Sequence, residues 1–172
     1  SKVLLNKHDA YLKRYVYSLV LENKVPQAIN VIKNSRDKRN IEFFEAHILL
    51  IIDSLKKNNF QKAHKYLIEI EEFQNYDRLN PVIIGILKNF IHTFSEKKIL
   101  QNKTSFGNIS IISQAFQRCY LNKETTRSSF INLINNPNGD YSRYIFFYAN
   151  YLIENKKIND AKEIYEDIKF IN

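Results

Sequence analysis

Apolar residues recur at steps of three and four along most of the chain, and this spacing limits the possible folds more than any other feature. The first run, with Leu12, Val16 and Leu19, marks one face of a helix that we expect to begin near Asp9. No segment shows the sustained alternation of apolar and polar residues that a half-buried strand requires. The 172 residues include three Gly and three Pro, too few for the many tight turns of a β-sandwich or a barrel. The spacing therefore predicts an all-α fold.

The boundaries of several helices carry their own signals. Pro26 and Pro81 suit the first turn of a helix, because proline lacks the backbone N–H that is unpaired there. Residues 41–57 are apolar most of the way round, which predicts a helix packed between neighbours. Asp140 is expected to cap a helix after an Asn-rich loop. Residues 95–108 are the least regular stretch, so we expect an irregular break there.

A short phrase recurs at the turns between consecutive helices. It combines a polar break of Asn and Lys with a small residue early in the second helix: Ala28, Ala63, Ser128 and Ala161. The small residue lets two helices approach closely, and the apolar residue usually found three positions before it is expected to plug the turn. Successive small residues are 35, 65 and 33 positions apart. Since 65 is nearly two periods, an eroded unit is expected at 81–103.

A period of about 34 residues with two helices per unit resembles the tetratricopeptide repeat family. The resemblance covers residues 1–172 as about five units, the third of them eroded, and implies a single domain. The implied fold is a right-handed α-solenoid of antiparallel helix pairs. The family's aromatic residue in the second helix is kept at Tyr165 and replaced by Ile32 and Leu67. The second half, 111–168, also looks like the C-terminal part of bacterial tetratricopeptide proteins. A plain helical bundle and the pentatricopeptide family of RNA-binding proteins are the alternatives.

Residues that carry enzyme chemistry are sparse in this sequence. Four histidines lie far apart, without metal-ligand spacing: His8, His47, His64 and His92. Cys119 is the only cysteine, so no internal disulfide can form, and we expect it to be a small core residue. No nucleophile-elbow or phosphate-loop motif occurs. We therefore expect no catalytic activity, no metal site and no cofactor.

The resemblance implies that function lies in a concave groove lined by the first helix of each pair. It places the groove residues fifteen and eleven positions before each small residue: Lys13, Tyr17, Ile48, Ile52, Ser113, Gln117, Phe146 and Asn150. Their mixed polarity suits a peptide or a partner helix, although a core role is the favoured interpretation for Ile48 and Ile52. We therefore expect a non-catalytic scaffold or adaptor that binds another protein or a homologous chain, with self-association expected.

The formal net charge of +8 is spread over the chain, with one local excess at 97–127, which we call the basic sector. Here six cations face a single acid, Glu124: Lys97, Lys98, Lys103, Arg118, Lys123 and Arg127. Phe106, Phe116 and Tyr120 are interleaved with them, and aromatics can stack bases while cations neutralise phosphates. Binding of RNA or of a single strand is therefore the alternative function. An accessory domain of a larger enzyme is a third interpretation.

No apolar run approaches the ~20 residues of a membrane-spanning helix, so we expect no membrane span. The chain starts at Ser1 and contains no Met, so we expect a fragment or a processed form. A cytoplasmic location is favoured, and a periplasmic one stays open if a signal segment has been removed.

Overall fold

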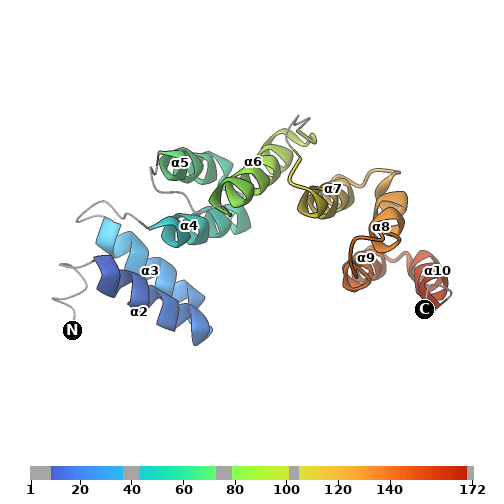
Figure 1. Ribbon diagram of the computed structural model, residues 1–172, viewed down its shortest axis with the longest axis horizontal. Coiled ribbons are helices and arrows are strands. Elements are labelled where there is room, and N and C mark those ends of the chain that lie inside the picture. Colours follow the sequence, from blue (N-terminus) through green and yellow to red (C-terminus); the bar gives the residue numbers. More distant parts are fainter. Residues whose placement is uncertain (1–8, 37–42, 73–78, 101–104, 170–172) are drawn as a thin grey trace. The chain divides into compact units, whose positions relative to one another are not determined.

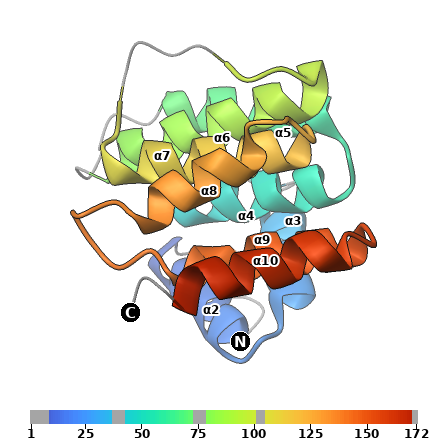
Figure 2. The ribbon, with the colours of Figure 1, turned by 90° about the vertical axis from the view of Figure 1, so that its right-hand side faces the viewer.

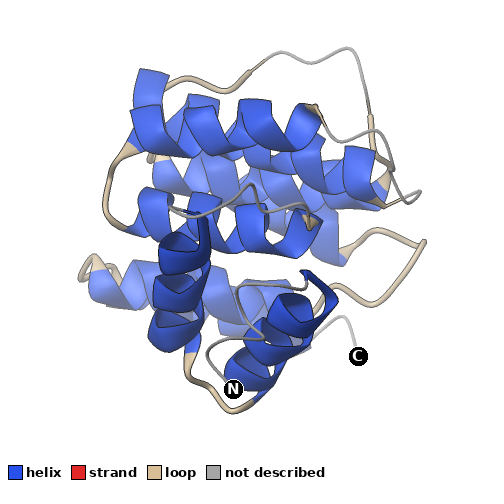
Figure 3. Ribbon diagram, turned by 90° about the vertical axis from the view of Figure 1, so that its left-hand side faces the viewer, coloured by secondary structure: helices blue, strands red, loops and turns tan. Residues whose placement is uncertain are grey.

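The computed structural model describes residues 9–36, 43–72, 79–100 and 105–169, and every regular element among them is a helix (Figures 1 and 3). The prediction of an all-α fold is therefore confirmed. The helices, labelled as in Figure 1, are α2 (Asp9–Leu21), α3 (Val25–Arg36), α4 (Phe44–Lys56), α5 (Phe60–Glu71), α6 (Asn80–Glu96), α7 (Asn108–Tyr120), α8 (Thr126–Ile134), α9 (Arg143–Glu154) and α10 (Ile158–Lys169).

Three of the helix starts in the described part of the chain follow local signals in the sequence. Pro26 and Pro81 are the second residues of α3 and α6, where a missing N–H leaves no hydrogen bond unmade. Asn59 caps α5, since its side-chain oxygen accepts a 3.0 Å hydrogen bond from the backbone N–H of Lys62. Asp140 acts differently from the prediction. Its carboxylate accepts hydrogen bonds from the backbone N–H and the hydroxyl of Ser142, and Ser142 occupies the N-cap position.

Four turns between helices share one backbone geometry. Each contains a residue in the left-handed region: Asn23, Asn58, Asn122 and Lys156, with φ between 50° and 61°. The N–H of the next residue donates to the carbonyl five positions back, as in the 2.7 Å bond from Lys24 to Leu19. The other three turns repeat this bond at 2.9, 3.0 and 2.8 Å. This is the Schellman arrangement, which pairs the last carbonyls of a helix. The Asn/Lys break in the sequence phrase is therefore a helix C-cap.

The helices form two compact units, Ser1–Ser95 and Glu96–Asn172, each with its own hydrophobic core. Within the first unit, α2 packs mainly on α3 and α4 on α5. Within the second, α7 packs mainly on α8 and α9 on α10, and the last two lie side by side in Figure 2. Helix α6 adds Ile84 and Ile91 to the first core. Consecutive helices thus bury their apolar faces against each other.

The small residues of the phrase are buried at three of the four turns: Ala28, Ala63 and Ala161. The apolar residue expected to plug the turn is partly buried at Val25 and Phe60 but exposed at Ile158. Close helix approach at these alanines follows from their lack of a bulky side chain.

The fourth copy of the phrase departs from the prediction. Ser128 is exposed, and the buried small residue of α8 is Thr126. Helix α8 begins four residues after Asn122, whereas the second helix begins two residues after the left-handed residue in the other three turns. The two additional turn residues, Glu124 and Thr125, shift α8 out of the register that the phrase implied.

The span 81–103, where the sequence predicted an eroded unit, contains one helix among its described residues. Helix α6 covers most of this span, and the described residues that follow it, 97–100, are not helical. The remaining residues, 101–103, lie outside the described part of the chain.

Candidate functional site

The predicted groove residues of the first unit come from α2 and α4. Lys13 lies on α2, with its Nζ 3.2 Å from Oε1 of Glu45 on α4 and 5.5 Å from the centre of the Tyr17 ring. Lys13, Tyr17 and Glu45 therefore form one polar cluster that joins the first helices of two consecutive pairs. Ile48 is half-buried against the core, whereas Ile52 is 44% exposed.

The charges of Lys13 and Glu45 offset each other in this cluster. Burial alone would raise the pKa of Glu45, but hydrogen bonding by Tyr17 and Lys13 outweighs burial, so its pKa is lowered. Burial and the neighbouring Glu45 raise the pKa of Tyr17. The carboxylate is therefore ionised and the phenol neutral near pH 7. Neither group is poised to exchange a proton at that pH, so the cluster acts as a cross-link between helices.

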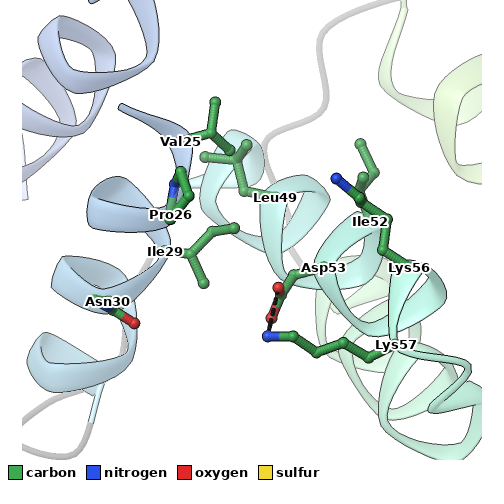
Figure 4. A pocket seen from close by; sticks show the side chains of 9 residues that line it. All are labelled: Val25, Pro26, Ile29, Asn30, Leu49, Ile52, Asp53, Lys56 and Lys57. Carbon is green, nitrogen blue, oxygen red and sulfur yellow. Dashed lines mark hydrogen bonds and ion pairs between the residues drawn. The ribbon is translucent and has the colours of Figure 1, made fainter. Parts of the chain in front are cut away.

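An open groove of about 490 Å³ lies between α3 and α4, and we call it the α3–α4 groove (Figure 4). Side chains of α3 face side chains of α4 across it: Val25, Pro26, Ile29 and Asn30 on one side, and Leu49, Ile52, Asp53, Lys56 and Lys57 on the other. Five of these nine side chains are apolar, and the charged ones lie in the C-terminal half of α4 (Asp53 and Lys56) and at its C-cap (Lys57). This volume falls within the ~300–1,000 Å³ typical of ligand sites.

An ion-pair network borders the α3–α4 groove. Asp53, only 13% exposed at its side chain, lies 2.7 Å from Nζ of Lys33 and 2.7 Å from Nζ of Lys57. Burial alone would raise the pKa of Asp53, but hydrogen bonds from the two lysines outweigh it and lower that pKa. Lys56 is exposed and has no ion-pair partner among the described residues. The charged residues of the groove lining are thus Asp53, Lys56 and Lys57, and Lys33 pairs with Asp53 from outside the lining.

The predicted groove residues Ser113 and Gln117 are buried on α7. Gln117 is 1% exposed and donates a 2.8 Å hydrogen bond to the hydroxyl of Ser113, which is also buried. Buried side chains of this kind cannot contact a partner. In the first unit, Lys13 and Tyr17 lie ten and six positions before the left-handed residue Asn23. The residues ten and six positions before the left-handed Asn122 are Ile112 and Phe116. Alignment of the sequence on Asn122, in place of the small residue, would have selected them.

Phe146 and Asn150 lie on the surface of α9. Phe146 is 57% exposed, and its ring centre is 5.9 Å from that of Tyr165 on α10. Asn150 is exposed and donates a 3.0 Å hydrogen bond to Glu154 on the same helix. Of the four groove residues predicted in the second unit, these two are accessible within that unit.

The basic sector is partly engaged inside the second unit. Arg118 donates to the hydroxyl of Ser129 at 3.0 Å, and Arg127 pairs with Glu163 at 2.8 Å. Lys97 donates to the hydroxyl of Tyr120 and lies over its ring. The other two described lysines of the sector, Lys98 and Lys123, are exposed, and Lys103 lies outside the described residues.

The aromatics of the basic sector also differ in exposure. Phe116 packs edge to face on the buried Phe130, with ring centres 5.5 Å apart. Phe106 is half-buried and Tyr120 is 45% exposed. A stacking platform that uses all three rings is therefore not formed.

No group of three or more His, Cys, Asp or Glu side chains is placed to hold a metal ion within the described ranges. Cys119 is buried, which raises the pKa of its thiol to about 11 and keeps it protonated near pH 7. His47 is buried as well, with Nδ1 3.4 Å from the carbonyl oxygen of Phe43 and Nε2 3.6 Å from Glu69. Both side chains belong to the packing of the helices.

None of the helices in the described part of the chain combines the length and the apolar character needed to cross a bilayer. Comparison of the chain with protein-family models, with curated proteins and with solved structures found no match.

Proposed function

We propose that this chain is a non-catalytic interaction scaffold that binds a peptide or a partner protein in a groove between its helices. The observation that carries this proposal is the α3–α4 groove, an open site with apolar walls and Ile52 exposed to solvent. The charged residues of its lining, Asp53, Lys56 and Lys57, are grouped at one end of the groove and do not converge on a single point inside it. Such a distribution suits recognition of a surface, since catalysis needs groups aimed at one reacting atom.

We further propose that the helices build a tetratricopeptide-like right-handed α-solenoid of antiparallel pairs. Two features support this architecture. The same Schellman turn closes the first helix of four pairs. In addition, Lys13 and Glu45 link α2 with α4, the first helices of consecutive pairs. A stack of such pairs leaves a row of first helices available to a partner.

The scaffold proposal can be tested by affinity capture with two variants that carry the same substitution, Ile to Asp, at two different positions. Ile52→Asp places a charge in the α3–α4 groove, whereas Ile68→Asp places the same charge on α5, at a residue of equal exposure (44% and 45%) outside the groove lining. Partner proteins retained by the unaltered chain should fall at least fivefold with Ile52→Asp and persist with Ile68→Asp, as measured by quantitative mass spectrometry. Equal retention by both variants, with unchanged circular dichroism, would refute the proposal.

Binding of a single-stranded nucleic acid is the second candidate, favoured by the exposed Tyr120 with Lys97 over its ring and by the exposed Lys98 and Lys123. It should appear as affinity for mixed RNA oligonucleotides that falls steeply with salt, because phosphate contacts release counterions. Absence of measurable affinity at about 50 mM salt removes this candidate.

A further inference from the structure

We propose that the α3–α4 groove recognises an extended peptide segment in which an apolar side chain lies about three residues from a carboxylate. This inference rests on the proposed scaffold function and assigns the chemistry of the partner.

The length of the groove suits a short extended segment. Its α4 wall is one stripe at helical spacing, from Leu49 through Ile52 and Asp53 to Lys56 and Lys57. At 1.5 Å per residue this stripe is about 12 Å long. An extended backbone advances about 3.3–3.6 Å per residue, so the groove spans roughly three to four peptide residues.

One end of the groove is apolar. Leu49 and Val25 are half-buried and face each other from the two helices, Ile29 is buried beneath them, and Ile52 is exposed. The lining residues at this end, Val25, Pro26, Ile29 and Leu49, are all apolar (Figure 4). An apolar side chain placed here would cover surface that now faces water, which is the main source of affinity at such sites.

The other end of the groove carries a positive excess. Asp53 is already paired with both Lys33 and Lys57, so it offers little attraction to an incoming cation. Lys56 has no acidic partner among the described residues and stands one helical turn beyond Ile52. A carboxylate therefore complements this border, and a second lysine or arginine would be repelled.

The distance between the two ends sets the spacing within the peptide. Leu49 and Lys56 are seven residues apart on one helix, which corresponds to about 10.5 Å. Three residues of extended backbone cover about the same distance. The apolar and acidic side chains of the partner should therefore be separated by about three positions.

Three matched peptides test this assignment by NMR titration of the isotope-labelled chain. Each is an eight-residue Gly/Ser peptide with blocked ends and one Leu, and the residue three positions after that Leu is Glu, Gln or Lys. The Glu peptide should bind at least threefold more tightly than the Gln peptide and tenfold more tightly than the Lys peptide at about 50 mM salt. This preference should shrink at about 500 mM salt, where screening shortens the range of the charge. The amide shifts should map to α3 and α4.

Two pairs of variants separate the two ends of the groove. Lys56→Ala should reduce binding of the Glu peptide twofold to fivefold and leave the Gln peptide unaffected, while Lys65→Ala, an exposed lysine of α5 outside the groove lining, should change neither. Ile52→Asp should weaken both peptides at least tenfold, and Ile68→Asp should not.

The possible failures are distinguishable. Equal binding of the Glu and Gln peptides overturns the acidic part of the inference, and binding unaffected by Ile52→Asp overturns the site. If no peptide binds but capture of partner proteins still depends on Ile52, the peptide chemistry is refuted and the scaffold function stands. If that capture fails as well, both proposals fall. Stronger shifts at α3 and α4 with a uridine oligonucleotide than with the Glu peptide would also overturn the assignment.

Discussion

At the scale of single residues, the turn positions are the most informative feature of this chain. A left-handed backbone costs an L-residue about 1–2 kcal/mol, costs Asn less and costs Gly nothing. The chain uses Asn at three of its Schellman turns and Lys at the fourth, and Lys97 has the same conformation after α6. The scarcity of Gly noted in the sequence therefore has an energetic consequence, and it is largest where Lys occupies the turn.

Lys156→Gly should raise the free energy of unfolding by about 0.5–1 kcal/mol, because it relieves the left-handed strain and this gain exceeds the extra chain entropy of Gly. The Asn58→Gly gain should be smaller, since Asn tolerates the conformation. Asn155→Gly is the matched control: its φ is −87°, so it should give no gain. Urea titration measures all three. A gain from Asn155→Gly equal to that from Lys156→Gly would contradict the strain argument.

The Asp53 network should make stability depend on pH. The folded-state pKa of Asp53 is below its ordinary value of 3.8, so its ion pairs stabilise the fold above that value and are lost as the pH falls through the lowered pKa. Asp53→Asn should therefore cost about 1–2 kcal/mol at pH 7 and progressively less below about pH 4. Glu71→Gln, which breaks an exposed pair with Lys88, should cost less than about 0.5 kcal/mol at any pH. A pH-independent cost of Asp53→Asn in unfolding titrations would contradict this account.

At the scale of helices, local signals in the sequence predicted that the helices exist and approximately where they begin and end. The starts of α3 and α6 follow from prolines that tolerate the first turn, whereas the predicted Asp140 cap was wrong, because Ser142 occupies the N-cap of α9. These signals depend on a few neighbouring residues and on backbone chemistry, so a sequence displays them directly.

Register and groove geometry could not be predicted in the same way. Glu124 and Thr125 resemble ordinary turn residues, and only the backbone shows that they delay α8 and bury Thr126 in place of Ser128. The α3–α4 groove depends on how two helices pack, so the sequence placed Ile52 in a groove but gave no reason to join it with Val25 or Ile29. Such contacts depend on tertiary packing, which no local pattern contains.

The register of the second helices can be checked by enlarging the small positions. Ala161→Leu should cost about 1–3 kcal/mol, because this buried site is close-packed between α9 and α10. Ser128→Leu should change stability by less than about 0.5 kcal/mol, because Ser128 is exposed on α8. Thermal or urea unfolding measures both. Equal destabilisation by the two variants would indicate that Ser128 lies between helices, as the repeated phrase suggested.

At the scale of the whole molecule, the helices divide into two units, and each unit has its own hydrophobic core. Ile51 and Ile145 are fully buried, one in each core. A unit with its own core can open by itself when its packing is damaged, because the free energy of opening is set by the contacts within it.

Ile51→Ala and Ile145→Ala should therefore have separate effects on amide hydrogen exchange. Each removes buried methyl groups and should destabilise its own unit by about 2–5 kcal/mol. Ile51→Ala should accelerate exchange in α2 to α5 and leave α7 to α10 close to the unaltered chain, and Ile145→Ala should do the reverse. Mass spectrometry of peptide fragments resolves the two sets of helices. If either variant accelerates exchange equally in both sets, the two cores open together, and the chain behaves as one cooperative domain of stacked pairs.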